Sequence, residues 1–186
     1  MTNNTVQTLY TELGTNLFAA LKNIRLLVCD VDGIFSDGRI YLGNAGEELK
    51  AFHTKDGYGI KSLRSIGVDV AIITGRSSHI VEQRMQSLGV QHIIQGCETK
   101  GQALSELLAQ EGLKHEQVAA MGDDMPDVGM FDLAAVKITV ADGHPMVKQN
   151  ANWITTLPGG FGAVREVTDT LLQAQGSLSD IHGASV

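Results

Sequence analysis

Short apolar runs alternate along the chain with segments in which apolar residues recur every three or four positions. The runs have the length of β-strands and are typical of strands buried on both faces of a parallel sheet. The spaced segments are typical of amphipathic helices. We expect strands over residues 24–30, 68–74, 91–95, 118–122, 136–140 and 152–155. We expect helices over residues 5–21, 57–66, 78–88, 100–111, 127–134, 145–150 and 162–175.

This alternation predicts an α/β fold, with a Rossmann-like parallel sheet and helices on both of its faces. Residues 39–52 interrupt it, because two short strand-like segments flank the turn sequence Gly-Asn-Ala-Gly and favour a β-hairpin flap. No insertion is long enough to form a cap domain. With 186 residues, we expect one domain over residues 1–186, with the flap at about 39–52 and a flexible tail at about 176–186.

Charge and composition exclude several classes of partner. The 14 basic and 21 acidic residues give a net charge of −7, which argues against binding to nucleic acid or to anionic membranes. The longest apolar run, residues 17–21, is far shorter than the roughly 20 residues that span a bilayer. The first residues are polar and show no secretory leader, and the two cysteines suggest no disulfide framework. We therefore expect a cytoplasmic protein.

Polar side chains gather where three of the expected strands end and where the helix after a further strand begins. In open α/β sheets, ligands bind outside the carboxyl ends of the strands, so these side chains are expected to meet at one edge. A single Asp after a strand is commonly a helix cap or a turn residue, but so many of them in this order favour a chemical site. The set is Asp30, Asp32, Thr74, Lys100, Asp123, Asp124 and Asp127.

The chemistry of this set suits phosphoryl transfer. Clustered carboxylates repel one another unless a cation holds them, and an all-oxygen site suits Mg²⁺ shared with a phosphate. Asp30 and Asp32 stand two residues apart and could face the same reacting group, so that one attacks while the other handles a proton. The Thr74 hydroxyl and the Lys100 ammonium could hold phosphate oxygens.

These residues resemble the four motifs of the haloacid dehalogenase superfamily of phosphatases. The blocks at residues 30–38, 44–52, 55–60, 72–76 and 159–166 further resemble the capless family that acts on 3-deoxy-D-manno-octulosonate (KDO) 8-phosphate. The resemblance covers about residues 20–175. It implies a haloacid dehalogenase-like fold and hydrolysis of a sugar-acid phosphate in lipopolysaccharide biosynthesis. It also implies a homotetramer in which each subunit roofs a neighbour's active site.

The resemblance implies a role for each carboxylate. Asp30 would be the nucleophile and a Mg²⁺ ligand. Asp32 would be the general acid–base and would place its backbone carbonyl on the metal. Asp123 would be the further carboxylate ligand, while Asp124 and Asp127 would orient metal-bound waters or the catalytic lysine.

The resemblance also implies the contacts to the substrate. An acidic protein that binds an acidic sugar phosphate needs a local cluster of cations. Relatives commonly carry Arg where this chain has Lys55 and Lys61, and Lys cannot form the two-pronged contact that Arg makes with a carboxylate. Thr74 and Lys100 would bind the phosphoryl oxygens. Further contacts would come from Asp32, His53, Thr54, Lys55, Asp56, Gly57, Lys61, Arg76 and Arg84.

Two alternatives stay open at this point. The substrate could be a related nine-carbon sugar-acid 9-phosphate, since Lys55 and Lys61 leave the sugar preference undecided. The chain could instead be a non-catalytic oligomerisation module. The presence of Asp30, Asp32 and Asp123 favours an enzyme over such a module.

Overall fold

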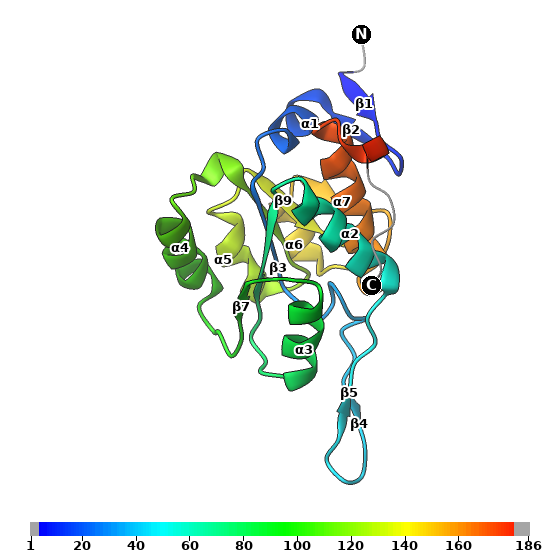
Figure 1. Cartoon of the computed structure of the whole chain (residues 1–186), viewed down its shortest axis with the longest axis vertical. Coiled ribbons are helices and arrows are strands. Elements are labelled where there is room, and N and C mark those ends of the chain that lie inside the picture. Colours follow the sequence, from blue (N-terminus) through cyan, green and yellow to red (C-terminus); the bar gives the residue numbers. More distant parts are fainter. Residues whose placement is uncertain (1–3, 181–186) are drawn as a thin grey trace.

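A computed structural model describes residues 4–180 of the chain. Its centre is a six-stranded sheet in the order β10-β9-β8-β3-β6-β7, in which all neighbouring strands run parallel. The predicted Rossmann-like sheet with helices on both faces is thereby confirmed (Figure 1). The strands are β3 (Leu26–Cys29), β6 (Asp69–Ile73), β7 (His92–Ile94), β8 (Val118–Met121), β9 (Val136–Thr139) and β10 (Trp153–Ile154).

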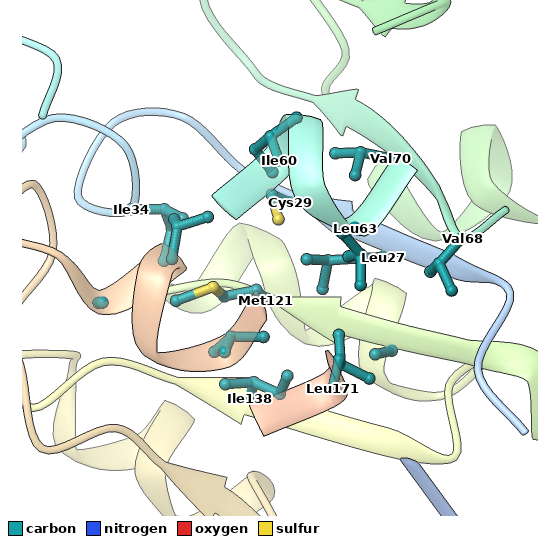
Figure 2. Packing of buried hydrophobic residues seen from close by; sticks show 14 of the residues in the cluster. Leu27, Cys29, Ile34, Ile60, Leu63, Val68, Val70, Met121, Ile138 and Leu171 are labelled. Carbon is teal, nitrogen blue, oxygen red and sulfur yellow. The ribbon is translucent and has the colours of Figure 1, made fainter. Parts of the chain in front are cut away.

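Strand β3 lies at the middle of the sheet and carries an unbroken apolar sequence because both of its faces are covered. Leu27 and Cys29 point into the core on one face, where they pack with residues such as Ile60 and Leu171 (Figure 2). Leu26 and Val28 belong to the core on the other face. The alternation of side chains along a strand thus divides one apolar run between two layers.

Helices form a layer on each face of the sheet. The first face carries α1 (Thr15–Leu21), α2 (Thr54–Ser65), α3 (His79–Ser87) and α7 (Ala163–Ala174), and the second carries α4 (Lys100–Glu111), α5 (Val128–Phe131) and α6 (Pro145–Asn150). Short 3₁₀ turns lie at η1 (His115–Gln117), η2 (Met125–Asp127) and η3 (Leu178–Asp180). Within residues 4–180, no helix has the length and apolar character needed to cross a membrane.

The helix expected over residues 5–21 is wrong in its first half. β1 (Thr5–Gln7) and β2 (Glu12–Gly14) form an antiparallel hairpin instead, and the helix begins only at Thr15. Between the strands, the Thr8 hydroxyl donates to the carbonyl of Thr11 and accepts from the backbone N–H of Tyr10. Such side-chain bonds to the local backbone compete with a helix. Of the tail expected to be flexible, residues 181–186 lie outside the described residues.

The predicted hairpin flap is present. β4 (Tyr41–Leu42) and β5 (Glu48–Leu49) pair antiparallel, and together they project from the body of the molecule (Figure 1). Tyr41, Leu42 and Leu49 are 44%, 71% and 64% exposed. In the described part of the chain, this flap is the only paired insertion between β3 and α2, so no cap domain covers the carboxyl edge of the sheet there.

Candidate active site

A cavity of about 340 Å³ opens at the carboxyl ends of β3, β6 and β8. From β3 the next crossover leads to β6 on one side, while β8 is its other neighbour, which makes this edge a topological switch point of the kind that binds ligands. The structure therefore brings together the side chains that the sequence places at strand ends. The predicted site residues among its lining are Asp30, Asp32, Thr74, Arg76, Lys100, Asp123, Asp124 and Asp127.

Asp30 and Lys100 form an ion pair at the buried floor of this cavity, with Asp30 Oδ1 2.9 Å from Lys100 Nζ. Burial and then the charge of Asp127 raise the pKa of Asp30, while Lys100 lowers it. Burial alone would lower the pKa of Lys100, but the charges of Asp30 and Asp127 raise it above its ordinary value. Lys100 is consequently a cation at neutral pH, and its charge favours the ionised form of the neighbouring Asp30 carboxylate.

Asp127 ties this lysine to the loop after β8. Its Oδ1 accepts a hydrogen bond of 2.6 Å from Lys100 Nζ. Its Oδ2 accepts from the backbone N–H groups of Asp123 and Asp124, at 2.9 and 3.1 Å. The side chain is buried, and both of its oxygens are thus used to hold other parts of the site in place.

The acidic residues fit a divalent metal ion. Carboxylate oxygens of Asp30, Asp123 and Asp127 lie within 4.8 Å of one another, although those of Asp127 already accept the hydrogen bonds described above. Asp123 Oδ1 is buried and has no hydrogen-bond partner among the described residues. Burial, together with the charges of nearby carboxylates, raises the pKa of Asp123 to about 7. A hard cation would supply the missing partner and favour the ionised form of these groups.

Gly33 allows the Asp123 carboxylate to approach the loop after β3. Its φ of +86° lies in the left-handed region that favours glycine. A Cβ at this position would overlap the Asp123 carboxylate. The glycine after the Asp30-Val31-Asp32 sequence is therefore required both by the backbone conformation and by the close contact with Asp123.

Asp32 contacts the flap through a residue that the sequence did not single out as functional. Lys50 Nζ donates to Asp32 Oδ1, which also accepts from the Ser36 hydroxyl at 3.2 Å. The side chain of Lys50 is only 1% exposed. The available signal was indirect: Lys50 stands two positions after Glu48, directly after the second strand of the hairpin, so the two side chains leave the same face of the extended chain.

The comparisons with known proteins agree with this geometry. Residues 92–159 match the model of the haloacid dehalogenase-like hydrolase family. The 3-deoxy-D-manno-octulosonate 8-phosphate phosphatase KdsC of Salmonella typhi is 46% identical over 179 residues, which are 96% of this chain and 95% of that protein. The chain belongs to the KdsC family of phosphatases. It is accordingly a hydrolase of phosphate monoesters.

Solved structures of the KdsC family share the fold over nearly the whole chain. The 3-deoxy-D-manno-octulosonate 8-phosphate phosphatase from Yersinia pestis has a TM-score of 0.95 and 46% identity, covering 98% of each chain. The enzyme of the same name from Moraxella catarrhalis was solved in complex with a magnesium ion, a phosphate ion and a KDO molecule. It has a TM-score of 0.87 and 41% identity, covering 89% of this chain and 95% of that one.

The segment from His53 to Gly57, expected from the KdsC resemblance to touch substrate, lies outside the described lining of the cavity. His53 precedes α2 as its N-terminal capping residue and accepts from the backbone N–H of Lys55 through Nδ1, at 3.1 Å. Thr54 and Lys55 are exposed in the first turn of α2. Asp56 is buried, and its Oδ1 accepts from the backbone N–H of Arg165 at 2.8 Å. This carboxylate therefore joins α2 to the beginning of α7 within the chain.

The cations expected to bind substrate do not all line the cavity within one chain. Arg76 lines the cavity, whereas Lys61 and Arg84 are absent from its described lining. Lys61 and Arg64 border a separate groove between the C-terminal parts of α2 and α3. Arg84 lies against Gly57, where a Cβ would overlap its guanidinium. The reason is geometric, because α2 carries Lys61 along the sheet away from its carboxyl edge. The contacts of Lys61 and Arg84 with substrate stay predictions.

Proposed function

We propose that this chain hydrolyses KDO 8-phosphate to the free sugar acid and inorganic phosphate in a Mg²⁺-dependent reaction. The observation that carries the proposal is the buried Asp30, which has Lys100 at 2.9 Å and the partnerless Asp123 oxygen beside it. The names of the KdsC relatives and the magnesium, phosphate and KDO of the Moraxella catarrhalis structure support the choice of substrate and metal. The proposed setting is lipopolysaccharide biosynthesis in the cytoplasm.

The first step transfers the phosphoryl group to Asp30. A carboxylate oxygen of Asp30 attacks phosphorus in line, and the bond from phosphorus to the sugar oxygen breaks. Asp32 donates a proton to the departing sugar oxygen. The Lys100 ammonium and the Thr74 hydroxyl hold the phosphoryl oxygens during the transfer. The product of this step is an aspartyl-phosphate on Asp30 and a free sugar acid.

The second step regenerates the enzyme. Asp32, now a carboxylate, takes a proton from a water molecule as that water attacks phosphorus. The bond between phosphorus and Asp30 breaks, inorganic phosphate leaves, and Asp32 is protonated again. Mg²⁺, held by Asp30, Asp123 and the backbone carbonyl of Asp32, would neutralise phosphoryl charge and keep the nucleophile ionised.

The proposed substrate contacts and the proposed assembly belong together. Arg76 would bind the sugar carboxylate, since it lines the cavity and its Nε lies 3.8 Å from Asp32 Oδ2. Within the described residues, the flap is the only paired insertion between β3 and α2, and a small charged sugar needs walls that exclude bulk water. We propose a homotetramer in which the flaps pack together and each subunit roofs a neighbour's active site. The apolar exposure of Leu42 and Leu49 supports this assembly.

A phosphate-release assay over a panel of substrates tests the function. The panel contains KDO 8-phosphate, the nine-carbon sugar-acid 9-phosphate, and hexose 6-phosphates, each with Mg²⁺ and with EDTA. We expect the highest kcat/KM for KDO 8-phosphate, no turnover in EDTA, and recovery when Mg²⁺ is added back. A higher kcat/KM for the nine-carbon substrate would establish that alternative. Absence of turnover with every substrate would favour the non-catalytic module.

A further inference from the structure

Four charged side chains form a closed ring between the flap and the cavity, with alternating signs. Lys50 Nζ contacts Asp32 Oδ1 and lies 3.4 Å from Glu48 Oε1. The Arg76 guanidinium lies 2.9 Å from Glu48 Oε2 and, through Nε, 3.8 Å from Asp32 Oδ2. Two carboxylates thus alternate with two cations around the ring. The flap contributes Glu48 and Lys50, and the strand ends of β3 and β6 contribute Asp32 and Arg76.

The sequence of the flap explains how two of these side chains reach the cavity. Glu48 and Lys50 are separated by one residue, so both side chains leave the same face of the strand. Leu49 between them faces away and is 64% exposed. The side chain of Lys50 is almost completely buried, at 1% exposed, while the side chain of Glu48 is 23% exposed. The flap is therefore attached to the body at its base through charges and projects beyond that base (Figure 1).

The ring fixes Oδ1 of Asp32 and leaves Oδ2 without a hydrogen bond from the described residues. Oδ1 accepts from Lys50 and from the Ser36 hydroxyl, whereas the 3.8 Å separation of Oδ2 from Arg76 Nε is too long for a hydrogen bond. Asp32 lies in the loop beyond the end of β3, where no strand pairing fixes its position. The two contacts to Oδ1 restrict the rotation of a carboxylate that must meet the leaving oxygen at hydrogen-bond distance.

We propose that Lys50 is a positioning residue for the reaction: it orients Asp32 so that its free oxygen protonates the leaving group. The inference rests on the proposed role of Asp32 as general acid. Lys50 contacts Asp32 on the side of Oδ1, and it is absent from the described lining of the cavity. Its effect on the reaction is accordingly exerted through Asp32.

Two substrates with different leaving groups distinguish a loss of acid positioning from a general effect on the fold or on phosphate binding. The alcohol oxygen of a sugar phosphate needs a proton as it departs, whereas p-nitrophenolate departs without one. In both cases kcat/KM includes only the steps up to departure of the leaving group, so the later attack of water does not enter the comparison. The measurement is kcat/KM with KDO 8-phosphate and with p-nitrophenyl phosphate for each variant.

For Lys50→Met we expect kcat/KM with KDO 8-phosphate to fall about 100-fold, which is within the usual range for loss of general acid catalysis. We expect kcat/KM with p-nitrophenyl phosphate to fall less than about threefold. Asp32→Asn is the reference variant and should show a split of the same direction. Lys22→Met removes an exposed lysine at the end of α1 and should leave both values unchanged. Ser36→Ala removes the other contact to Oδ1 and should show a smaller split, which keeps the test available if Lys50→Met does not fold.

Equal losses with both substrates would overturn the inference, because they would place the effect of Lys50 on the fold or on the phosphoryl group. Unchanged or higher activity of Lys50→Met with KDO 8-phosphate would also overturn it. If Asp32→Asn shows no split, the proposed role of Asp32 as acid fails and the inference fails with it. If Asp32→Asn shows the split but Lys50→Met and Ser36→Ala do not, the proposed function stands and only the inference fails.

Discussion

Asp127 Oδ1 lies 2.6 Å from Lys100 Nζ in the buried floor of the cavity. The other oxygen of Asp127 accepts two backbone N–H groups of the loop that carries Asp123. One carboxylate thus fixes both the lysine assigned to the phosphoryl group and the loop assigned to the metal. A substitution of Asp127 is therefore expected to weaken both phosphoryl transfer and metal binding.

Asp127→Asn should lower kcat about 10- to 100-fold and raise the Mg²⁺ concentration needed for half-maximal activity. The amide keeps the size of the side chain but has one acceptor oxygen, so it cannot serve both Lys100 and the loop. Steady-state kinetics over a Mg²⁺ titration measures both effects. Asp132→Asn, at an exposed position just after α5, is the matched control and should behave as wild type. Wild-type kinetics for Asp127→Asn would show that the bridge is dispensable.

Gly33→Ala should weaken activation by Mg²⁺, because its Cβ would displace the Asp123 carboxylate. The control is Gly67→Ala, since Gly67 has a similar φ of +81° and no atom within 4 Å of an added Cβ. Both variants should lose roughly 1–2 kcal/mol of unfolding free energy from the left-handed backbone. Denaturant unfolding and Mg²⁺ titration of activity separate the two effects. A similar response of both variants to Mg²⁺ would contradict the assigned contact between Gly33 and Asp123.

The sheet and the floor of the site were predictable from the sequence because both follow from local patterns. Apolar runs such as that around Leu27 identify buried strands, and parallel strands bring their carboxyl ends to one edge. Asp30, Thr74 and Asp123 were therefore placed together without knowledge of side-chain conformation. The same reasoning located the flap, because its turn sequence is flanked by two short strands.

The remaining features depend on how elements pack, which no local pattern reports. The ring contact between Lys50 and Asp32 requires the flap to fold back onto the strand end, and 18 positions separate the two residues. Lys61 was grouped with Arg76 by charge and by the family resemblance, neither of which reports that α2 takes Lys61 to another groove of the single chain. The hairpin at residues 5–14 was missed because Thr8 bonds its local backbone in place of a helical partner.

Asp56→Asn should reduce the dependence of stability on pH. Burial raises the pKa of Asp56 from 3.8 to about 7, so between these values the folded state holds a proton that the unfolded state has lost. The free energy of unfolding contributed by this group therefore falls as pH rises from about 4 to about 7. An Asn keeps an acceptor for the Arg165 N–H and does not ionise. Relative to wild type, the variant should therefore gain stability as pH rises from about 4 to about 7 in urea unfolding. A constant difference across this range would contradict the assignment.

Leu42→Asp should lower the assembly state and, with it, kcat/KM. Leu42 is the most exposed apolar side chain of the flap, and a charge there would oppose burial between the proposed four flaps. Light scattering should give a mass near four chains for wild type and a lower mass for the variant. Leu9→Asp is the matched control: Leu9 is 63% exposed in the N-terminal hairpin, at the other end of the molecule from the flap (Figure 1). A fully active monomer would show that a neighbour contributes nothing to the site.

The proposed nucleophilic attack by Asp30 is tested by the kcat of Asp30→Asn with KDO 8-phosphate at saturating Mg²⁺. The amide is nearly the same size as the carboxylate, so thermal unfolding should confirm that the variant folds. We expect kcat to fall by more than about 100-fold, equivalent to roughly 2.7 kcal/mol of activation free energy, because the amide is a poor nucleophile. A folded Asp30→Asn variant that keeps more than about a hundredth of wild-type kcat would contradict the proposed attack by Asp30.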